Sequence, residues 1–262
     1  MSDAPIAFDD GAGYERMMGG WSRVAGDVFL DWLALPPALR WLDVGCGNGA
    51  FTERIVARAA PASVDGIDPS EGQLAYARAQ PAGAPVRYRL GDAMALPYAS
   101  QSFDVALMAL VIFFVPDPAA GVAEMVRVVR PGGTVATYIW DMHGGGFPYA
   151  TLATVLREMG APPPKPQSVA VSKLDALGAL WREAGLEDVE TREIVVERRF
   201  PSFDDVWEAT LSTVSLRDAR EAQADDRIAE IRERLRMRIA IAADGSITQR
   251  ARANAVRGRR PA

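Results

Sequence analysis

Cysteine and histidine are nearly absent from this chain. Among 262 residues there is one cysteine, Cys46, and one histidine, His143. A single cysteine excludes an internal disulfide, which fits a reducing compartment. With one residue of each kind, and no carboxylates clustered at ligand spacing, the sequence gives no support for a metal site.

Long apolar runs and a strong charge of one sign are also missing. The longest apolar run, 105–115, is too short to span a bilayer and ends at Pro116. The N-terminus is acidic and lacks the basic and apolar regions of a signal peptide. A net charge of −5 leaves no electrostatic footprint for nucleic acid or anionic lipid. These absences predict a cytoplasmic protein with no membrane insertion and no nucleic-acid partner.

Apolar runs and amphipathic segments alternate regularly over residues 41–140. The run 103–111 is apolar on both faces, which is typical of a central strand in a parallel sheet. Ser70 and Gln73 have the spacing of a capping box, and the helix over 118–130 is expected to end at a Pro-Gly-Gly sequence. This alternation predicts a doubly wound α/β sheet.

The pattern changes after residue 140. A glycine-rich loop, a short helix and a proline-rich connector are expected before a helix that has Ser172 and Asp175 as its capping pair and Gly185 as its C-terminal cap. We predict a single domain, 1–262, with four segments: N-terminal lid helices (1–39), a cofactor-binding core (40–140), a substrate-side segment (141–187) and a C-terminal segment (188–262). The C-terminal segment would contain the last two strands, 188–199 and 248–258, with a helical insertion, 203–243, between them.

Three glycines, Gly45, Gly47 and Gly49, lie between the first expected strand and the first helix. In an open parallel sheet, ligands bind at the carboxyl ends of the strands, and glycines there let a ligand approach the backbone. Asp68 lies at the end of the second strand, a position that suits a carboxylate accepting hydrogen bonds from both hydroxyls of a ribose. Alone, this pattern also satisfies the G-x-G-x-x-G/A motif of dinucleotide-binding proteins.

Two further carboxylates favour a cationic ligand. Asp92 follows the third strand and is placed to accept a hydrogen bond from an exocyclic amine such as that of adenine. Asp43 precedes the first glycine by two residues, where it would repel a pyrophosphate and attract an ammonium group. Three acids around one loop therefore suggest a positively charged nucleoside ligand.

Five segments in succession resemble motifs of the class I S-adenosylmethionine-dependent methyltransferases: "LDVGCGNG", "VDGIDPS", "GDAMALPY", "FDVALMALVIFFVPDP" and "RPGGTVATYIW". They are most similar to the type 11, or ubiquinone/menaquinone-biosynthesis, small-molecule branch. The resemblance covers about residues 40–140. It implies S-adenosylmethionine as the cofactor and a mostly parallel seven-stranded sheet of order 3-2-1-4-5-7-6, with strand 7 antiparallel.

The resemblance also implies a set of cofactor contacts. The glycine loop would meet the methionyl part, the end of the second strand the ribose, and the segment after the third strand the adenine, while an N-terminal helix closes over the ligand. The positions are Tyr14, Trp21, Asp43, Gly45, Cys46, Gly47, Asn48, Asp68, Pro69, Ser70, Asp92, Ala93, Met94 and Leu110.

The acceptor side is less defined. Phe113, Phe114, Trp140 and Tyr149 either line an apolar acceptor pocket or belong to the core. His143 is the candidate general base, the alternative being a solvated histidine in a glycine-rich loop.

Methyl transfer from a sulfonium is an in-line displacement that needs an aligned, desolvated acceptor, and orientation alone supplies roughly 7–11 kcal/mol. We therefore expect transfer to a small, partly apolar acceptor at oxygen, nitrogen or carbon, under a lid built from the N-terminal helix, the loop 141–149 and residues 203–243. The insertion would cover its own site or, in a homodimer, that of a neighbour.

Three other functions compete with this one. A nicotinamide-dependent oxidoreductase would share the glycine loop, although Asp43 and Asp92 argue against it. A methyltransferase-fold protein that binds the cofactor without methylating would share every motif. A nucleic-acid methyltransferase is disfavoured by the net negative charge of the chain and by the absence of an N/D-P-P-Y/F sequence after the fourth strand.

Overall fold

The computed structural model describes residues 11–80, 86–213, 215–216 and 224–262. Its seven strands form one sheet of order β3-β2-β1-β4-β5-β7-β6, in which β7 runs antiparallel to both of its neighbours. This confirms the predicted fold class and strand order. The strands are β1 (Arg40–Val44), β2 (Ser63–Asp68), β3 (Val86–Leu90), β4 (Phe103–Ala109), β5 (Val129–Trp140), β6 (Glu187–Phe200) and β7 (Ile247–Arg259).

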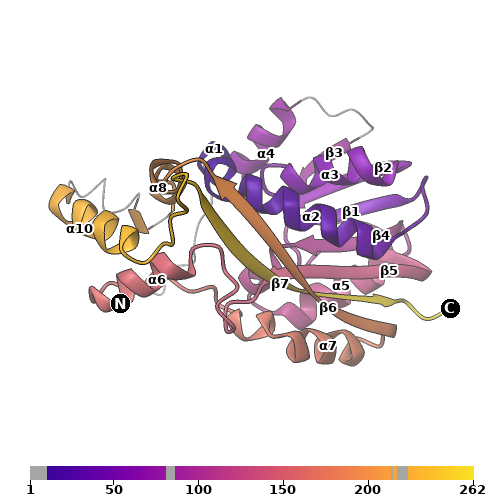
Figure 1. The fold of residues 1–262 in the computed structure, drawn as a ribbon. Coiled ribbons are helices and arrows are strands. Elements are labelled where there is room, and N and C mark those ends of the chain that lie inside the picture. The colour runs from indigo at the N-terminus through magenta and orange to yellow at the C-terminus, as the bar shows by residue number, and fades with distance from the viewer. Residues whose placement is uncertain (1–10, 81–85, 214, 217–223) are drawn as a thin grey trace.

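Helices cover both faces of the sheet. In Figure 1, α2 and α3 lie over one face and α5 and α7 over the other, while α6, α8 and α10 lie beyond the carboxyl ends of the parallel strands. Within the described ranges, no helix has both the length and the apolar character needed to cross a membrane. The helices are α1 (Gly11–Tyr14), α2 (Gly20–Leu33), α3 (Ala50–Ala59), α4 (Glu71–Ala79), α5 (Pro118–Val128), α6 (Ala150–Glu158), α7 (Leu174–Glu183), α8 (Phe203–Leu211) and α10 (Asp225–Arg236).

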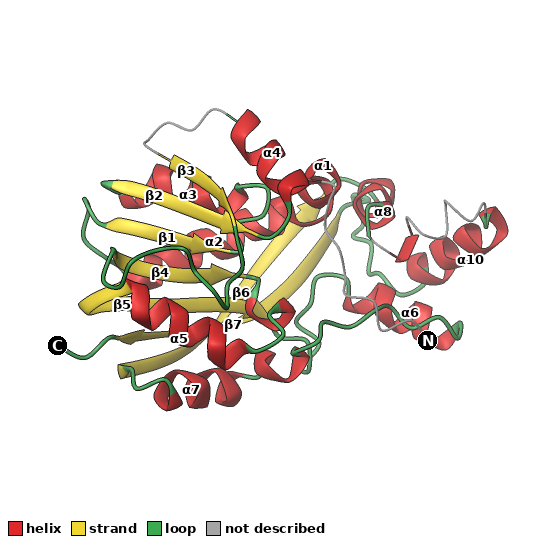
Figure 2. Ribbon diagram, turned by 180° about the vertical axis from the view of Figure 1, so that it is seen from behind, coloured by secondary structure: helices red, strands yellow, loops and turns green. Residues whose placement is uncertain are grey.

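The order of strands creates the place for a ligand. β1 pairs with β2 on one side and with β4 on the other, so the chain winds outward in both directions from the β1–β4 pair. As predicted, β4 is central, and Val105, Leu107 and Met108 are fully buried on it. Loops that follow β1 and β4 leave in opposite directions, which opens a crevice between them. Figure 2 shows these strand ends pointing toward α1, α6 and α8.

The capping box predicted at the start of α4 forms only in part. The Ser70 hydroxyl accepts a hydrogen bond from the Gln73 amide at 3.3 Å, as expected of an N-cap. The Ser70 amide, however, donates to the Asp68 carboxylate at 2.9 Å instead of to Gln73. Among the described residues, the buried Gln73 Oε1 has no hydrogen-bond partner.

Two predicted helix ends are wrong. Helix α5 ends at Val128, and the Pro-Gly-Gly sequence continues β5 instead of forming a turn. Gly132 has φ +72°, and a Cβ atom on Gly133 would lie 2.6 Å from the Asp104 carbonyl oxygen. These two glycines therefore allow β5 to pair with β4 where the register of the pairing shifts, between Phe103 and Val105. Lys173, not Ser172, is the N-cap of α7.

The C-terminal end of α7 agrees with its prediction. Gly185 has φ +77°, and its neighbour Leu186 donates its amide to the Trp181 carbonyl, as in a Schellman motif. The insertion is helical as expected, with Ile231 and Leu235 of α10 buried in a layer beside α6. Strand β7 is interior, as the predicted order requires, and β6 pairs along its outer side.

Helix α2 packs closely beside the ligand crevice because Gly26 has no side chain. A Cβ atom there would lie 2.8 Å from the buried Phe51 ring of α3. We expect Gly26→Ala to lower the free energy of unfolding by about 1–3 kcal/mol, because overpacking outweighs the gain in helix propensity.

Urea denaturation of the purified chain measures this change. Gly72→Ala is the matched control, because Gly72 is a helical glycine on the exposed side of α4 and its replacement should leave stability equal or slightly higher. Equal effects of the two substitutions would contradict the packing argument.

Candidate functional site

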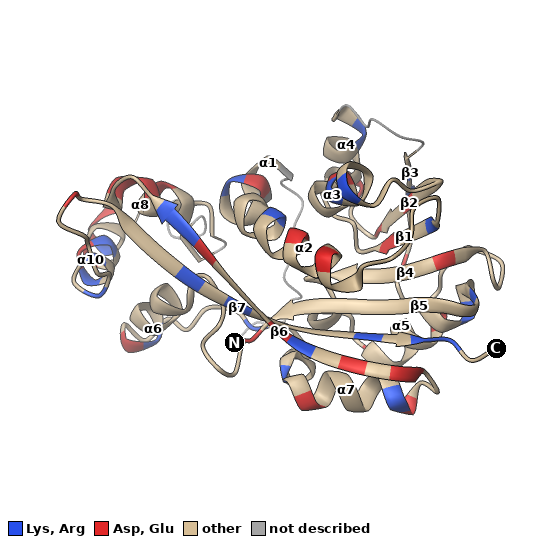
Figure 3. Cartoon of the chain, turned by 45° about the vertical axis from the view of Figure 1, so that its right-hand side comes forward, with Lys and Arg blue, Asp and Glu red and all other residues tan. Residues whose placement is uncertain are grey.

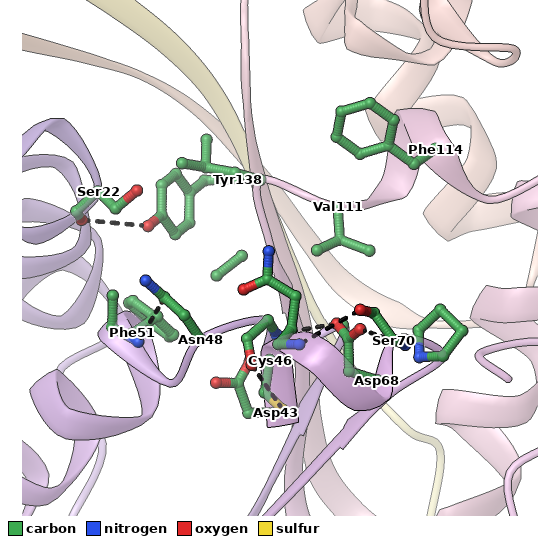
Figure 4. Close-up of a pocket in the computed structure, with 17 residues that line it drawn as sticks. Ser22, Asp43, Cys46, Asn48, Phe51, Asp68, Ser70, Val111, Phe114 and Tyr138 are labelled. Carbon is green, nitrogen blue, oxygen red and sulfur yellow. Dashed lines mark hydrogen bonds between the residues drawn. The ribbon is translucent and has the colours of Figure 1, made fainter. Parts of the chain in front are cut away.

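A cavity of about 360 Å³ lies at the carboxyl ends of β1, β2 and β4. Figure 4 shows side chains from α2, the β1–α3 loop, the end of β2 and the segment after β4 converging on it. Nine of the predicted cofactor residues line this cavity: Asp43, Gly45, Cys46, Gly47, Asn48, Asp68, Pro69, Ser70 and Leu110. Sequence reasoning did not assign a cofactor role to the other eight lining residues: Ser22, Ala50, Phe51, Gln73, Ala109, Val111, Phe114 and Tyr138.

The glycine loop needs its glycines for two reasons. Gly45, Gly47 and Gly49 have φ values of +74°, +52° and +83°, a backbone conformation that residues other than glycine rarely adopt. A Cβ atom on Gly45 would also lie 2.5 Å from Val111, whereas at Gly47 the nearest atom would be 3.9 Å away, at Gln73 Oε1. Backbone at Gly47 is therefore open to a ligand.

Asp68 organises the loop and borders the cavity. Its two carboxylate oxygens accept the amides of Gly47 and Ser70, each at 2.9 Å. Burial raises the pKa of this carboxyl, although the two hydrogen bonds act in the opposite sense. Each oxygen keeps a second lone pair, so Asp68 is able to accept ligand hydroxyls as well.

Asp43 is fully buried beneath the loop. Its Oδ2 accepts a hydrogen bond from the Thr52 hydroxyl at 2.7 Å, while Oδ1 has no partner among the described residues. Burial raises the pKa of the Asp43 carboxyl to about 7; the Thr52 hydrogen bond lowers it and the nearby Asp68 charge raises it. A cationic ligand would supply the partner that this buried oxygen lacks.

The polar lining of the cavity accepts hydrogen bonds and carries negative charge. Among the described residues that line it, Asp43 and Asp68 are the charged ones, and none is a lysine or an arginine. The Gln73 side-chain oxygen adds a further buried acceptor. This arrangement fits a ligand with a positive charge and hydroxyl or amino donors, and it disfavours a pyrophosphate.

Cys46 is a poor nucleophile. Its side chain is buried, and burial together with the charges of Asp43 and Asp68 raises the pKa of the thiol. The thiolate, which is the reactive form, is thereby suppressed. This environment favours a packing role for Cys46 over a catalytic one.

Several predicted cofactor residues do not line the cavity. Asp92 is exposed and accepts the Met94 amide at 2.8 Å, so that 92–95 forms a surface turn. Trp21 is fully buried and packs edge-on against Trp140, with ring centroids 6.4 Å apart. The side chain of Tyr14 lies outside the described part of the structure.

A second cavity, of about 320 Å³, adjoins the first. Leu110 and Phe114 line both cavities and form the partition between them. The N-terminal turn 15–19, the loop 141–149, α6, the proline-rich segment and the residues after α8 supply the other walls. All five residues predicted for acceptor chemistry line this second cavity: Phe113, Phe114, Trp140, His143 and Tyr149.

The partition has an unusual backbone. Leu110 follows the last residue of β4 with φ +62°, a left-handed conformation that is rare for a residue with a bulky side chain. Its amide donates to the Tyr138 carbonyl at 2.9 Å, which holds it at the strand end. Such a conformation turns the chain sharply between the two cavities, and strained residues of this kind gather at functional sites.

Hydrogen bonds anchor the loop 141–149 at both ends. Asp141 forms an ion pair with Arg252 of β7, and the Gly146 and Arg252 backbones hydrogen-bond to each other at 2.9 Å. At the other end, the buried Tyr149 hydroxyl donates to the Met17 carbonyl at 2.6 Å. The loop thus holds the N-terminal turn over the second cavity, with His143 exposed at its edge.

No group of three or more potential metal ligands occurs in the described portion of the chain. The strand order, with β7 antiparallel, and the crevice between β1 and β4 are those of the class I methyltransferase architecture.

Comparison with known proteins supports this class. Residues 42–137 match the family described as Methyltransferase domain. The ubiquinone/menaquinone biosynthesis C-methyltransferase UbiE of Dinoroseobacter shibae is 40% identical over 123 residues, which is 45% of this chain and 49% of the relative. Residues 42–137 therefore resemble a methyltransferase domain, and the chain is similar to UbiE over part of its length.

Solved structures share the fold at low identity. Phosphoethanolamine N-methyltransferase 2 of Haemonchus contortus, in complex with S-adenosyl-L-methionine, aligns with TM-score 0.58 and 18% identity over 96% of this chain and 56% of that one. The [4+2]-cyclase SpnF aligns with TM-score 0.54 and 20% identity over 96% and 94%. The chain spans about half the length of the curated relatives it matches.

The raised pKa of Asp43 has a measurable consequence. An unfolded aspartate ionises near pH 4, whereas folded Asp43 ionises near pH 7, so its contribution to stability is complete below pH 4 and is lost as the pH rises to 7. We expect Asp43→Asn to become more stable relative to the wild type over this range, by up to about 4 kcal/mol.

Urea unfolding at several pH values between 4.5 and 8 measures this difference. Asp104→Asn is the control: burial opposes ionisation of Asp104, but hydrogen bonds from Arg40 and Arg130 hold its pKa below the usual range. Its contribution is lost only at lower pH, so that variant should differ from the wild type by a constant amount. A constant difference for Asp43→Asn as well would contradict the raised pKa.

Proposed function

We propose that this protein transfers a methyl group from S-adenosylmethionine to a small, partly apolar acceptor. One observation carries the proposal: a cavity whose charged lining is two buried carboxylates lies against an apolar cavity, with Leu110 and Phe114 as their common wall. A cationic cofactor suits the first cavity, and an apolar acceptor suits the second.

The residues present fit this cofactor. Asp43 offers a buried oxygen that has no partner among the described residues to an ammonium group, and Gly47 leaves its backbone open to the cavity. Asp68 is the candidate partner of the ribose hydroxyls, with Gln73 Oε1 as a further acceptor. When bound, S-adenosylmethionine supplies a methyl group made electrophilic by its sulfonium.

The remaining catalytic work is positioning and exclusion of water. The second cavity would hold the acceptor against the partition, and orientation of this kind is worth roughly 7–11 kcal/mol. The Tyr149–Met17 hydrogen bond keeps the N-terminal turn in place over that cavity. Aromatic side chains at Phe113, Phe114 and Trp140 keep its interior poor in water.

His143 is the candidate base for a hydroxyl or amine acceptor. It lines the second cavity from the loop 141–149 and is exposed at its edge. An imidazole in this position would take the proton that an oxygen or nitrogen acceptor releases. A carbon acceptor activated by its own substituents would have less need of it.

The second cavity is built from this chain's own segments. Met17 and Met18 precede the sheet, and Thr213 and Ser215 follow α8, yet all four line the same space. The insertion therefore contributes to the cavity of its own protomer, and a homodimer is not needed to complete it. In Figure 3, acidic and basic positions are interspersed along α2, β6 and α10, which fits a small-molecule partner better than nucleic acid.

Calorimetric titration with S-adenosylhomocysteine and with NADH tests the cofactor assignment. We expect S-adenosylhomocysteine to bind and NADH to give no heat, because the buried carboxylates would repel a pyrophosphate. Asp68→Ala should weaken S-adenosylhomocysteine binding by about 10- to 100-fold, since a hydrogen bond to a charged group contributes about 1.5–3 kcal/mol.

Asp92→Ala is the comparison variant for Asp68→Ala. Asp92 is a carboxylate that was also predicted to bind the cofactor, but it lies on an exposed turn outside the cavity. Tight NADH binding without a response to S-adenosylhomocysteine would reject the proposal and favour an oxidoreductase. Cofactor binding without methyl transfer to any acceptor in a broad panel would favour a protein that uses this fold for another reaction.

His143→Ala tests the base assignment once an acceptor is known. If His143 removes a proton, the variant should lose about 100-fold or more in kcat, and its pH–rate profile should change. His143→Gln, which keeps a hydrogen-bonding side chain without a titrating base, serves as the comparison. An unchanged rate and pH profile would show that His143 takes no part.

A further inference from the structure

We propose that the acceptor has an apolar body and ends in an anionic group, which Arg157 and Lys165 bind at the outer rim of the second cavity. This inference deepens the proposed function, on which it rests for the reaction itself. It adds the chemical class of the acceptor and two residues that determine specificity.

The charge of the second cavity is one-sided. Among the described residues that line it, Arg157 and Lys165 are the permanently charged ones, and none is an aspartate or glutamate. The first cavity has the opposite character, with two carboxylates and no basic side chain. A neutral or cationic acceptor would gain nothing from the two cations, whereas an anionic one would be attracted by both.

The two cations lie away from the partition. Arg157 is in the last turn of α6 and Lys165 is in the proline-rich segment that follows; both side chains are exposed, and neither lines the first cavity. Leu110 and Phe114, in contrast, border both cavities. An acceptor would therefore place its reacting end at the partition and its anionic end at the solvent-facing rim.

Neighbouring acids do not neutralise this rim. Glu158, the acidic residue next to Arg157, is paired with Arg238 at 2.5 Å. No ion pair or side-chain hydrogen bond joins Arg157 or Lys165 to another described residue. Arg157 also suits the negative end of the α6 dipole, but Lys165 is outside any helix, so helix stabilisation does not account for both.

The local chain also favours binding by Lys165. It is one of only two lysines in the sequence and lies between Pro164 and Pro166. The prolines restrict the backbone on both sides, so less conformational entropy is lost when the segment holds a ligand. A carboxylate or a phosphate monoester would each satisfy the two cations.

Calorimetry on the full chain without cofactor tests the inference with three probes of equal length: octanoate, octyl phosphate and octan-1-ol. We expect at least one anionic probe to bind roughly tenfold more tightly than the alcohol at low salt, since two exposed charge pairs contribute modestly. The difference should shrink at 1 M salt because of screening. The order of octanoate and octyl phosphate identifies which anionic group the rim prefers.

The double variant Arg157→Gln/Lys165→Gln should bind the anionic probes about as weakly as the alcohol. Lys173→Gln/Arg182→Gln is the matched control, because it removes the same charges from the start and end of α7, outside both cavities. It should keep the preference for anions.

Equal binding of alcohol and anions by the wild type, no binding of any probe, or an anion preference that survives in the rim variant would each overturn the inference. S-adenosylhomocysteine titration of every variant reports the first cavity independently. Retained affinity for it shows that the variants are folded, and separates failure of the acceptor assignment from failure of the proposed function.

Discussion

Burial of two carboxylates, Asp43 on β1 and Asp68 at the end of β2, is the constraint on which the rest of this structure depends. Asp43 is fully buried and Asp68 nearly so, and each has a raised pKa because burial disfavours its charged form. Asp68 offsets part of this cost by accepting the amides of Gly47 and Ser70, which in turn set the shape of the glycine loop. The loop conformation and the negative charge of the cavity therefore have one origin.

The two cavities divide the chemistry between them. The first has acidic walls and lies within the regular alternation of strands and helices, while most walls of the second are apolar and come from segments outside that alternation. They meet at Leu110 and Phe114, directly after the central strand. A sharp left-handed turn at Leu110 allows one strand end to border both. Opposite charges on the two linings would orient a cationic cofactor and an anionic acceptor toward the same partition.

Local rules predicted the elements well and their ends less well. The strand order and the Gly185 cap are confirmed, because both follow from short-range patterns and from a family resemblance that spans five motifs. The end of α5 and the cap of α7 were wrong. In both places tertiary contacts overrode local preference: β5 pairs with β4 through the Pro-Gly-Gly sequence, and Ser172 is buried with its carbonyl bound by Asn254.

The sequence by itself determined the fold, the position of the glycine loop and the acids around it, because these depend on residue type and spacing along neighbouring strands. Only the tertiary structure showed that Ser22, Gln73 and Tyr138 border the first cavity and that Trp21 and Asp92 do not. The tertiary structure alone showed that the N-terminal turn, the loop 141–149 and the residues after α8 line one apolar cavity. Contacts between segments so distant in the chain leave no periodic signal, so folding alone brings them together.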